Sequence, residues 1–377
     1  MTDSDDTVEK IQGINLVPEP TKPYLNKRQL VDYRDHREKL IKWCLNLGKD
    51  PEMAEGYAQT TIRQRSYRLD KFYRWVWEEQ EDGYTLDITT KHADDYMRHL
   101  AYEDTSSTYK ATAQKAVKML FKWQRHVLGR DVDWEPDLNF SSNTGTTQPR
   151  DFLTIEDRKK LREAALEYGT IPRYSGLTPE QRDKWRAHLA QRFEKPKDEV
   201  TPQDWERANG WKVPSLVWTT LDAGLRPIEV ERAKVSWVDT DNHLLRIPKE
   251  DSSKNTDNWA VSLQDRTLNA LKKWLTERKQ YERYNGNQHL WLTRHGNPYN
   301  TRSLNYLMDQ LCEETEIEHD NRDVTWYSIR HSVGTYMTRE EGLKAAQIQL
   351  RHKSERTTMR YDQAPVEDRK EALDKMG

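Results

Sequence analysis

Apolar residues recur at helical intervals along the N-terminal third of the chain. Between residues 57 and 80 they predict an amphipathic helix, with Ile62, Leu69, Phe72, Tyr73, Val76 and Trp77 on one face. Similar patterns predict helices over 27–47, after Thr89-Thr90, and over 107–128, where a cluster of Ser and Thr supplies a helix cap. Residues 27–138 are therefore predicted to form a small helical domain.

The segments on either side of this domain are polar. Residues 139–150 hold Asn, Ser, Thr, Gly and Pro with few apolar groups, which indicates a linker between domains. Residues 1–19 carry five acids and one lysine with few bulky groups, so a flexible acidic tail is expected over 1–26.

The remaining residues, 151–377, predict a larger domain. Helical patterns occur over 153–168, 266–284, 301–315, 327–339 and 343–351 and again near the C-terminus. Two extended segments, 243–248 and 258–263, flank a polar turn and predict a β-hairpin. The fold class expected is thus mainly α: a small helical domain and a larger mixed α+β domain with a small antiparallel sheet. Residues 169–210 are charged and interrupted by Pro, without evident chemistry.

Composition restricts the class of protein. The 377 residues include 14 Trp and 18 Tyr, which need burial, so disorder throughout is excluded although only 34% of residues are apolar. Apolar runs are too short to span a membrane, the N-terminus lacks a secretory pattern, and two distant cysteines fit no disulfide framework or four-ligand zinc site. A cytoplasmic protein is expected.

Charge is nearly balanced overall but not locally. The chain has 61 basic and 63 acidic residues, which by itself argues against a nucleic-acid partner. However, residues 105–130 contain six Lys or Arg and no acid. On a helix, the apolar side would hold Ala113, Ala116, Val117, Leu120, Trp123 and Val127, and the opposite side would hold Lys115, Lys118, Lys122 and Arg125. This side is either an ordinary solvated face or a surface that follows DNA phosphates.

The first motif with chemical meaning is Gly224-Leu225-Arg226-Pro227-Ile228-Glu229. Arg226 precedes a proline and so begins a helix, where backbone amides favour anions. Glu229 follows one turn later, at a spacing that lets it hold the guanidinium. Alone, the segment is also consistent with a surface arginine at a helix start.

Four further residues with polar chemistry follow in order. Arg330 and His331 lie near the start of a predicted helix, and His352 precedes Tyr361 by nine residues. Each residue alone is more often structural than functional. The informative feature is the ordered set across one domain.

This ordered set resembles the tyrosine recombinases of the phage-integrase and Xer type, over roughly residues 57–377. The resemblance implies a helical, SAM-like core DNA-binding domain and a catalytic domain that cuts and rejoins double-stranded DNA through a 3′-phosphotyrosyl intermediate, without metal, ATP or another cofactor. It also implies specific recombination sites and a homotetramer on paired sites. The catalytic set it implies is Arg226, Lys254 (with Lys249 as the fallback), Tyr327, Arg330, His352 and the nucleophile Tyr361.

Two positions depart from the family pattern. Tyr327 stands where the family usually has His or Lys, and Arg351 replaces the glycine that commonly precedes the later histidine. A tyrosine donates a hydrogen bond to a phosphate oxygen, but with a reference pKa of about 10 it is a poor base at neutral pH.

Several functions remain open. One is a DNA-binding protein without catalysis, in which 343–361 forms a helix-turn-helix whose phosphate-facing residues are Arg351, His352, Arg356 and Arg360. Another is a type IB topoisomerase, although the compact helical N-terminal domain favours a recombinase. Among recombinases, integration or excision of a mobile element is favoured over resolution of chromosome or plasmid dimers, by analogy.

Overall fold

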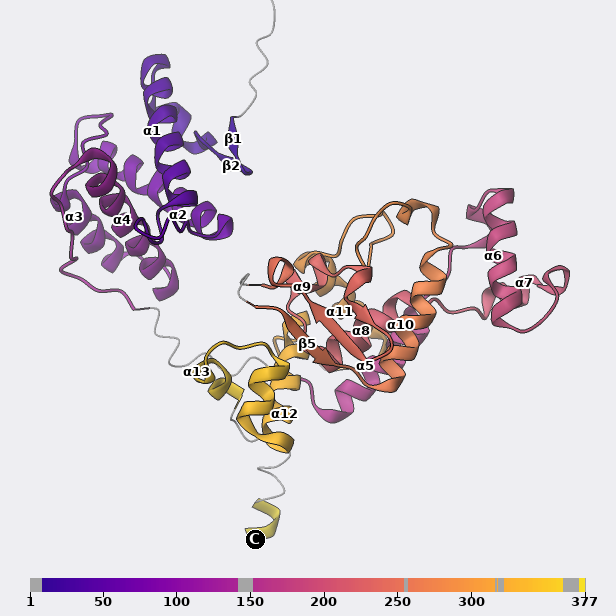
Figure 1. Ribbon diagram of the computed structural model, residues 1–377. Helices are drawn as coiled ribbons and strands as arrows, with labels where there is room; N and C mark the ends of the chain where they lie inside the picture. The colour runs from indigo at the N-terminus through magenta and orange to yellow at the C-terminus, as the bar shows by residue number, and fades with distance from the viewer. Residues whose placement is uncertain are drawn as a thin grey trace, which may run out of the picture. The chain divides into compact units, whose positions relative to one another are not determined.

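The computed structural model describes residues 9–141, 152–253, 257–315, 317, 322–361 and 373–376. The chain divides into two compact units, Met1–Thr146 and Thr147–Gly377. Each unit has its own apolar core, and both are built mainly from helices (Figure 1). With one three-stranded antiparallel sheet in the second unit, the predicted fold class is confirmed.

Unit 1 contains the four predicted helices. They are α1 (Lys27–Asn46), α2 (Gln59–Trp75, continued by the π-helical turn η2, Val76–Gln80), α3 (Thr90–Tyr102) and α4 (Ser107–Leu128). The apolar faces pack on one another, and α2 packs most extensively on α4. The Ser106 side chain accepts a hydrogen bond from the Tyr109 amide at the start of α4, and Gly129 ends the helix with φ 64°.

The expected flexible tail over residues 1–26 is wrong for residues 9–26. These form a small hairpin, β1 (Lys10–Ile11) with β2 (Ile14–Asn15), and the 3₁₀ helix η1 (Glu19–Tyr24). The physical reason is a short apolar run that covers the unit 1 core, in which Ile14, Leu16 and Val17 are all buried. Residues 1–8 lie outside the described residues.

Unit 2 is arranged around a buried helix, α8 (Lys212–Ala223), of whose twelve residues ten are buried. It packs against α5 (Ile155–Tyr168), α10 (Asp265–Arg278), α12 (Trp326–Gln349) and the sheet. The sheet has the order β3-β4-β5, formed by Val238–Asp239, Leu244–Ile247 and Trp259–Ser262. Strands β4 and β5 are the predicted hairpin, with Leu245 opposite Val261.

The remaining elements of unit 2 are short or peripheral. Residues 169–210 form a lobe at one end of the unit (Figure 1), with its own small core around Trp185, Leu189 and Trp205. The lobe consists of η3 (Tyr174–Gly176), α6 (Pro179–Arg192), η4 (Lys197–Glu199) and α7 (Pro202–Glu206). Elsewhere lie α9 (Pro227–Arg232), η5 (Val235–Trp237), η6 (Lys249–Asp251), η7 (Glu282–Tyr284) and α11 (Thr301–Glu314).

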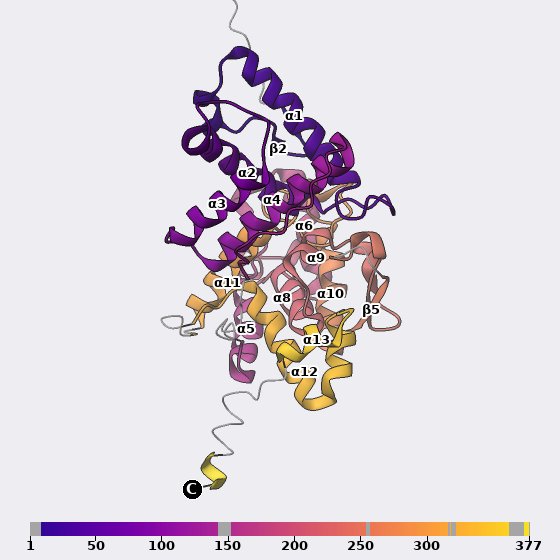
Figure 2. The ribbon, with the colours of Figure 1, turned by 90° about the vertical axis from the view of Figure 1, so that its left-hand side faces the viewer.

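The C-terminal part of unit 2 folds back on itself. Helix α12 bends at Gly342, whose φ of 82° is not helical, in agreement with the two separate helices predicted there. A turn then leads to α13 (Glu355–Thr358) and η8 (Met359–Tyr361). Because α13 and η8 both contact α12 (Figures 1 and 2), Tyr361 returns to the helix that carries Arg330.

Candidate active site

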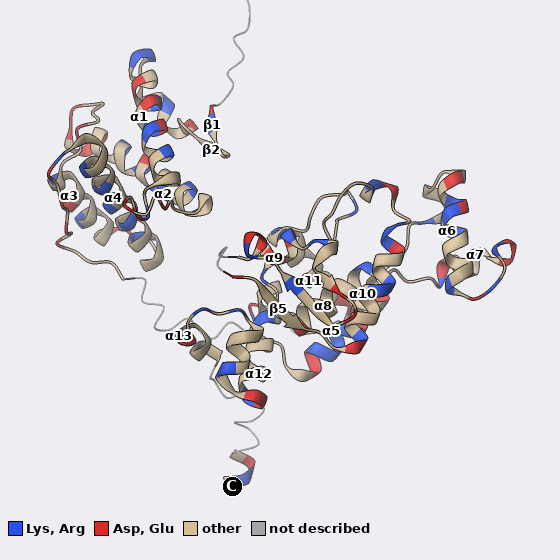
Figure 3. Ribbon diagram, in the orientation of Figure 1, with Lys and Arg blue, Asp and Glu red and all other residues tan. Residues whose placement is uncertain are grey.

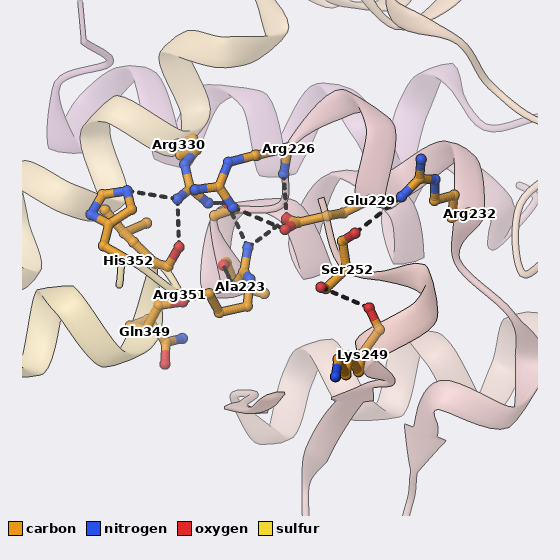
Figure 4. Close-up of polar contacts among 12 residues, drawn as sticks. Ala223, Arg226, Glu229, Arg232, Lys249, Ser252, Arg330, Gln349, Arg351 and His352 are labelled. Atoms are coloured by element: carbon orange, nitrogen blue, oxygen red, sulfur yellow. Dashed lines mark hydrogen bonds and ion pairs between the residues drawn. The ribbon is translucent and has the colours of Figure 1, made fainter. Parts of the chain in front are cut away.

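Four predicted site residues lie close together in unit 2, at a point where distant segments of the chain meet. Arg226 is at the N-terminus of α9, Arg330 on α12, His352 in the turn after α12, and Tyr361 in η8. The close-up in Figure 4 shows Arg226, Arg330 and His352 directed toward one region around Glu229.

Arg226 is held by the first turn of its own helix. Its amide donates to Glu229 Oε2 at 2.8 Å, and its Nη1 donates to Oε1 at 3.0 Å, as the sequence spacing predicts. Burial by itself would raise the pKa of Glu229, but the surrounding arginines, Arg351 foremost, lower it to about 2. Glu229 is therefore an anion at neutral pH.

Arg330 is fully buried, which is unusual for an arginine. Its Nη1 donates to the Gly224 carbonyl and its Nη2 to the Leu350 carbonyl, so it joins the end of α8 to the end of α12. Burial, together with the charges of Arg351 and Arg226, lowers its pKa to about 10. Arg330 is still a cation at neutral pH.

The hydrogen bonds of His352 define its tautomer. Arg330 Nη2 lies 2.9 Å from His352 Nε2, and a guanidinium only donates, so Nε2 is the acceptor. Nδ1 then carries the proton and donates to Thr358 Oγ1 at 2.9 Å. These hydrogen bonds thus assign a neutral imidazole to His352, in which the Nε2 lone pair accepts from the Arg330 guanidinium.

Tyr361 lies in the same unit as these groups and is 6% exposed. Its ring stacks on that of His352, with centroids 5.8 Å apart and planes 10° apart, and lies 5.3 Å from the His331 ring. Burial raises the pKa of the phenol, and the cations of Arg330 and Arg226 partly oppose that rise. The arginines therefore favour the phenolate relative to an equally buried tyrosine elsewhere.

The other two predicted site residues are placed differently. Tyr327 is half-buried one turn before Arg330 and 5.2 Å from the His331 ring. Lys254 lies outside the described residues. Lys249, its fallback, begins η6, and its carbonyl accepts a hydrogen bond from Ser252 Oγ at 2.9 Å (Figure 4).

A cavity of about 90 Å³ opens beside Glu229. Its cations are Arg226, Arg351 and Lys353, whereas its one acid already has two arginine partners. Its hydroxyl groups come from Ser252, Ser253, Ser354 and Thr357. Cations and hydroxyl donors around one small space suit a phosphate group. Across the described residues, no three His, Cys, Asp or Glu side chains are grouped as metal ligands.

Sequence reasoning missed the structural contribution of Gly334 and Thr358. A Cβ atom at Gly334 would lie 2.6 Å from the Tyr361 ring, and Thr358 Oγ1 is the hydrogen-bond partner of His352 Nδ1. Arg351 was noticeable only as a departure from the glycine expected there. The burial and the partners of Arg351 depend on contacts between distant residues, which a local sequence pattern cannot predict.

The helix-turn-helix alternative over 343–361 is wrong. Helix α13 has only four residues, too few to lie along a DNA groove as a recognition helix. Arg351 and His352, which that alternative directs toward phosphates, are buried at 5% and 6% exposure.

The predicted basic face of α4 is only partly as expected. Lys115, Lys118 and Arg125 are exposed (basic residues are blue in Figure 3), and Lys115 and Lys118 form no hydrogen bond or ion pair with the described residues. Lys122 instead donates to the carbonyls of Gly48 and Lys49, both at 2.9 Å, because that loop folds over the helix. On the opposite side, Val127 is 46% exposed rather than buried, because it lies in the last turn of α4.

The site combines an arginine-lined pocket with a buried tyrosine, and comparison with known proteins connects it to a family. The family model described as "Phage integrase family" matches residues 211–367. Residues 211–367 are therefore similar to this family, and over this part of the chain the resemblance to the tyrosine recombinases, which are DNA strand-transfer enzymes, is confirmed. No curated protein matches the chain.

Solved structures share the fold over most of the chain. The XerH site-specific recombinase, in its post-cleavage complex with palindromic difH substrate, is 15% identical, with 92% of this chain and 88% of that chain covered and a TM-score of 0.58. The Tn1549 transposon integrase in complex with transposon right end DNA is 12% identical, with 88% and 98% covered and a TM-score of 0.54. A lambda integrase dimer bound to a COC′ core site is 13% identical, with 90% and 82% covered and a TM-score of 0.50.

Within the part of the chain that the structure describes, no helix is both long and apolar enough to cross a membrane.

Proposed function

We propose that the protein is a site-specific DNA recombinase that cuts and rejoins double-stranded DNA through a 3′-phosphotyrosyl intermediate at Tyr361. The observation that carries the proposal is the stacking of Tyr361 on His352, which in turn is hydrogen-bonded to Arg330. A nucleophile and the donors for its target phosphate thus lie together in one unit.

The reaction assigned to this site is a transesterification. The Tyr361 phenol gives its proton to water, and its oxygen attacks phosphorus to form the phosphotyrosyl bond. The bond to the 5′ oxygen breaks, and that oxygen takes up a proton and leaves as a 5′-hydroxyl. Rejoining reverses these steps, and because the covalent link conserves the phosphodiester, neither ATP nor a metal is needed.

Each charged group has a part in this step. Arg226 and Arg330 bind the non-bridging oxygens, on which negative charge increases in the transition state. His352 donates to the same phosphate once Arg330 has exchanged its imidazole partner for a phosphate oxygen and the imidazole proton has moved to Nε2, with Nδ1 then accepting from the Thr358 hydroxyl. Tyr327 adds a neutral donor, and Lys254 gives the proton that the departing 5′ oxygen requires.

The biological role that we propose is integration or excision of a mobile element, by a homotetramer on paired specific sites in cytoplasmic DNA. Resolution of chromosome or plasmid dimers by the same chemistry is the alternative. The exposed Lys115 and Lys118 of α4 support a DNA-binding role for unit 1, because a row of unpaired cations binds phosphates without regard to sequence.

The test is capture of the covalent intermediate. Overlapping duplexes from the DNA that flanks the reading frame are lightly nicked with DNase I, so that the short 5′-hydroxyl fragment diffuses away and the adduct accumulates. The full chain should become covalently attached to one such duplex, and Tyr361→Phe should bind it without attachment. Attachment by the Phe variant, or by neither protein on any duplex, would contradict the proposal. Efficient relaxation of a supercoiled plasmid without that duplex would favour a type IB topoisomerase.

A further inference from the structure

Arg351 occupies an unusual position next to the proposed phosphate pocket. Its backbone has φ 57°, in the left-handed region that glycine adopts readily and other residues rarely adopt. The residue is 5% exposed, and its side chain lines the cavity beside Glu229. A long cationic side chain is thus buried at a place where the backbone itself favours glycine, which implies that its contacts offset the strain.

The contacts of Arg351 join three separate points of unit 2: the end of α8, the end of α12 and Glu229 on α9. Its Nη1 donates to the carbonyls of Ala223 and Gln349, both at 2.7 Å. Its Nη2 donates to the Gly224 carbonyl at 3.1 Å and to Glu229 Oε2 at 2.7 Å. The Glu229 and Arg351 side chains are each only 1% exposed, so this ion pair is shielded from water (Figure 4).

The ion pair with Arg351 determines which Glu229 oxygen is available to the Arg226 side chain. Oε2 already accepts from Arg351 and from the Arg226 amide, so the Arg226 side chain reaches only Oε1, through Nη1. Among the described residues, none accepts a hydrogen bond from Nε or Nη2 of Arg226. These two groups remain for an incoming phosphate, in the fork geometry that arginine uses to bind one.

Arg351 also changes the charge of the site. With Arg226 and Arg330 it makes three buried or half-buried cations against the single anion Glu229. With a glycine at this position, the carboxylate would cancel half of the charge of the two remaining arginines. The extra cation offsets a loss elsewhere, because Tyr327 supplies no positive charge where the family usually has His or Lys.

We propose that Arg351 is a positioning residue that holds and neutralises Glu229, so that the charge of Arg226 and Arg330 is available to the scissile phosphate. The inference rests on the proposed recombinase function. It does not require Arg351 to touch the DNA.

The experiment measures the rate of adduct formation on the flanking-DNA duplex that captures the full chain. Arg351→Gly suits the backbone, removes the cation and should slow adduct formation 10- to 100-fold while DNA affinity changes less than threefold. In a Glu229→Gln background the same change should slow it less than threefold, because no carboxylate remains to be neutralised. If Arg351→Gly fails to fold, Arg351→Gln replaces it in both comparisons.

A second substrate separates an electrostatic role from a merely structural one. A neutral methylphosphonate at the mapped scissile position carries less charge for the arginines to stabilise, so the loss caused by Arg351→Gly should shrink at least fivefold on it. Equal losses on both substrates, or an unchanged rate on the phosphate, would overturn the inference. If the wild-type chain forms no adduct on any duplex, the proposed function fails and the inference falls with it.

Discussion

Gly334 and Tyr361 fit together only because Gly334 has no side chain. A Cβ atom there would lie 2.6 Å from both Cγ and Cδ1 of the Tyr361 ring, and 2.9 Å from a methyl group of Leu350. Gly334 has ordinary helical geometry on α12, so its absence of a side chain serves the tyrosine and not the backbone. The resting position of the proposed nucleophile therefore depends on a residue 27 positions earlier in the sequence.

Gly334→Ala should displace Tyr361 and slow adduct formation. Overpacking of this kind costs about 1–3 kcal/mol, equivalent to roughly 5- to 150-fold in rate if the tyrosine must return for the reaction. Single-turnover capture of the protein on a nicked duplex measures this rate of adduct formation. Gly176→Ala is the matched control, because nothing lies within 4 Å of its Cβ position. If Gly334→Ala forms the adduct at the wild-type rate, the observed position of Tyr361 is irrelevant to the reaction.

Arg330→Lys should reduce adduct formation strongly although it keeps the charge. A lysine cannot donate simultaneously to the Gly224 and Leu350 carbonyls and to His352 Nε2, as the guanidinium does. Loss of one transition-state donor costs about 3–4 kcal/mol, or roughly 10²- to 10³-fold in rate. Arg186→Lys serves as control, because the half-buried Arg186 side chain lies in the peripheral lobe and donates only to the Tyr174 hydroxyl among the described residues. A loss below about threefold at position 330 would exclude it from the phosphate-binding set.

The lysines of α4 should separate into two kinds. Replacing both Lys115 and Lys118 by Ala should lower the slope of log affinity against log salt by about 2, because each phosphate contact contributes about 0.9. Lys122→Ala should leave the slope unchanged and reduce thermal stability, because it removes the donor to the Gly48 and Lys49 carbonyls. Fluorescence anisotropy at several salt concentrations measures the slopes. The reverse pattern would contradict the described contacts of α4.

Glu277 predicts a pH dependence of stability in unit 2. It is fully buried on α10, where the Trp211 amide donates to its Oε2 at 2.9 Å. Burial raises the pKa of Glu277 to about 7, although the Trp211 amide, Arg192, Tyr281 and Lys212 all oppose the rise. In the unfolded chain its pKa is about 4.3.

Because the folded protein holds this proton more tightly, stability should fall as the pH rises between about 4.3 and 7 and then level off, by about 4 kcal/mol in total. Lys212, whose burial lowers its pKa to about 8, titrates above this window. Calorimetric unfolding at pH 4.5, 6 and 7.5 gives the free energy of unfolding of the wild type and of Glu277→Gln. The wild-type value minus that of the variant should decline as the pH rises. Parallel curves for the two proteins would refute it.

Local sequence patterns predicted most elements and few of the contacts. The helices of unit 1 and the β4–β5 hairpin follow from periodicity and turn residues, and the Arg226–Glu229 pair follows from its spacing on one helix. Helix α8 escaped prediction because it is buried on nearly all sides and so has no polar face, and because Pro214 interrupts its pattern, although a proline in a first turn is tolerated.

Contacts between distant residues account for the remaining differences. Lys122 was expected on an open surface, but the loop at Gly48 covers it, 74 residues away in sequence. The helix-turn-helix alternative directed Arg351 toward DNA phosphates, but its side chain pairs with Glu229, 122 residues earlier. Neither contact leaves a local signal, because both depend on how complete elements pack.

The measurement that tests the account most directly is identification of the amino acid bound to DNA. The trapped adduct would be digested with nuclease and trypsin, and the modified peptide sequenced by mass spectrometry. The account predicts a nucleotide on the phenol oxygen of Tyr361, linked through a 3′-phosphate, with a 5′-hydroxyl on the released strand. A nucleotide on another residue, or a 5′-phosphate linkage, would contradict it.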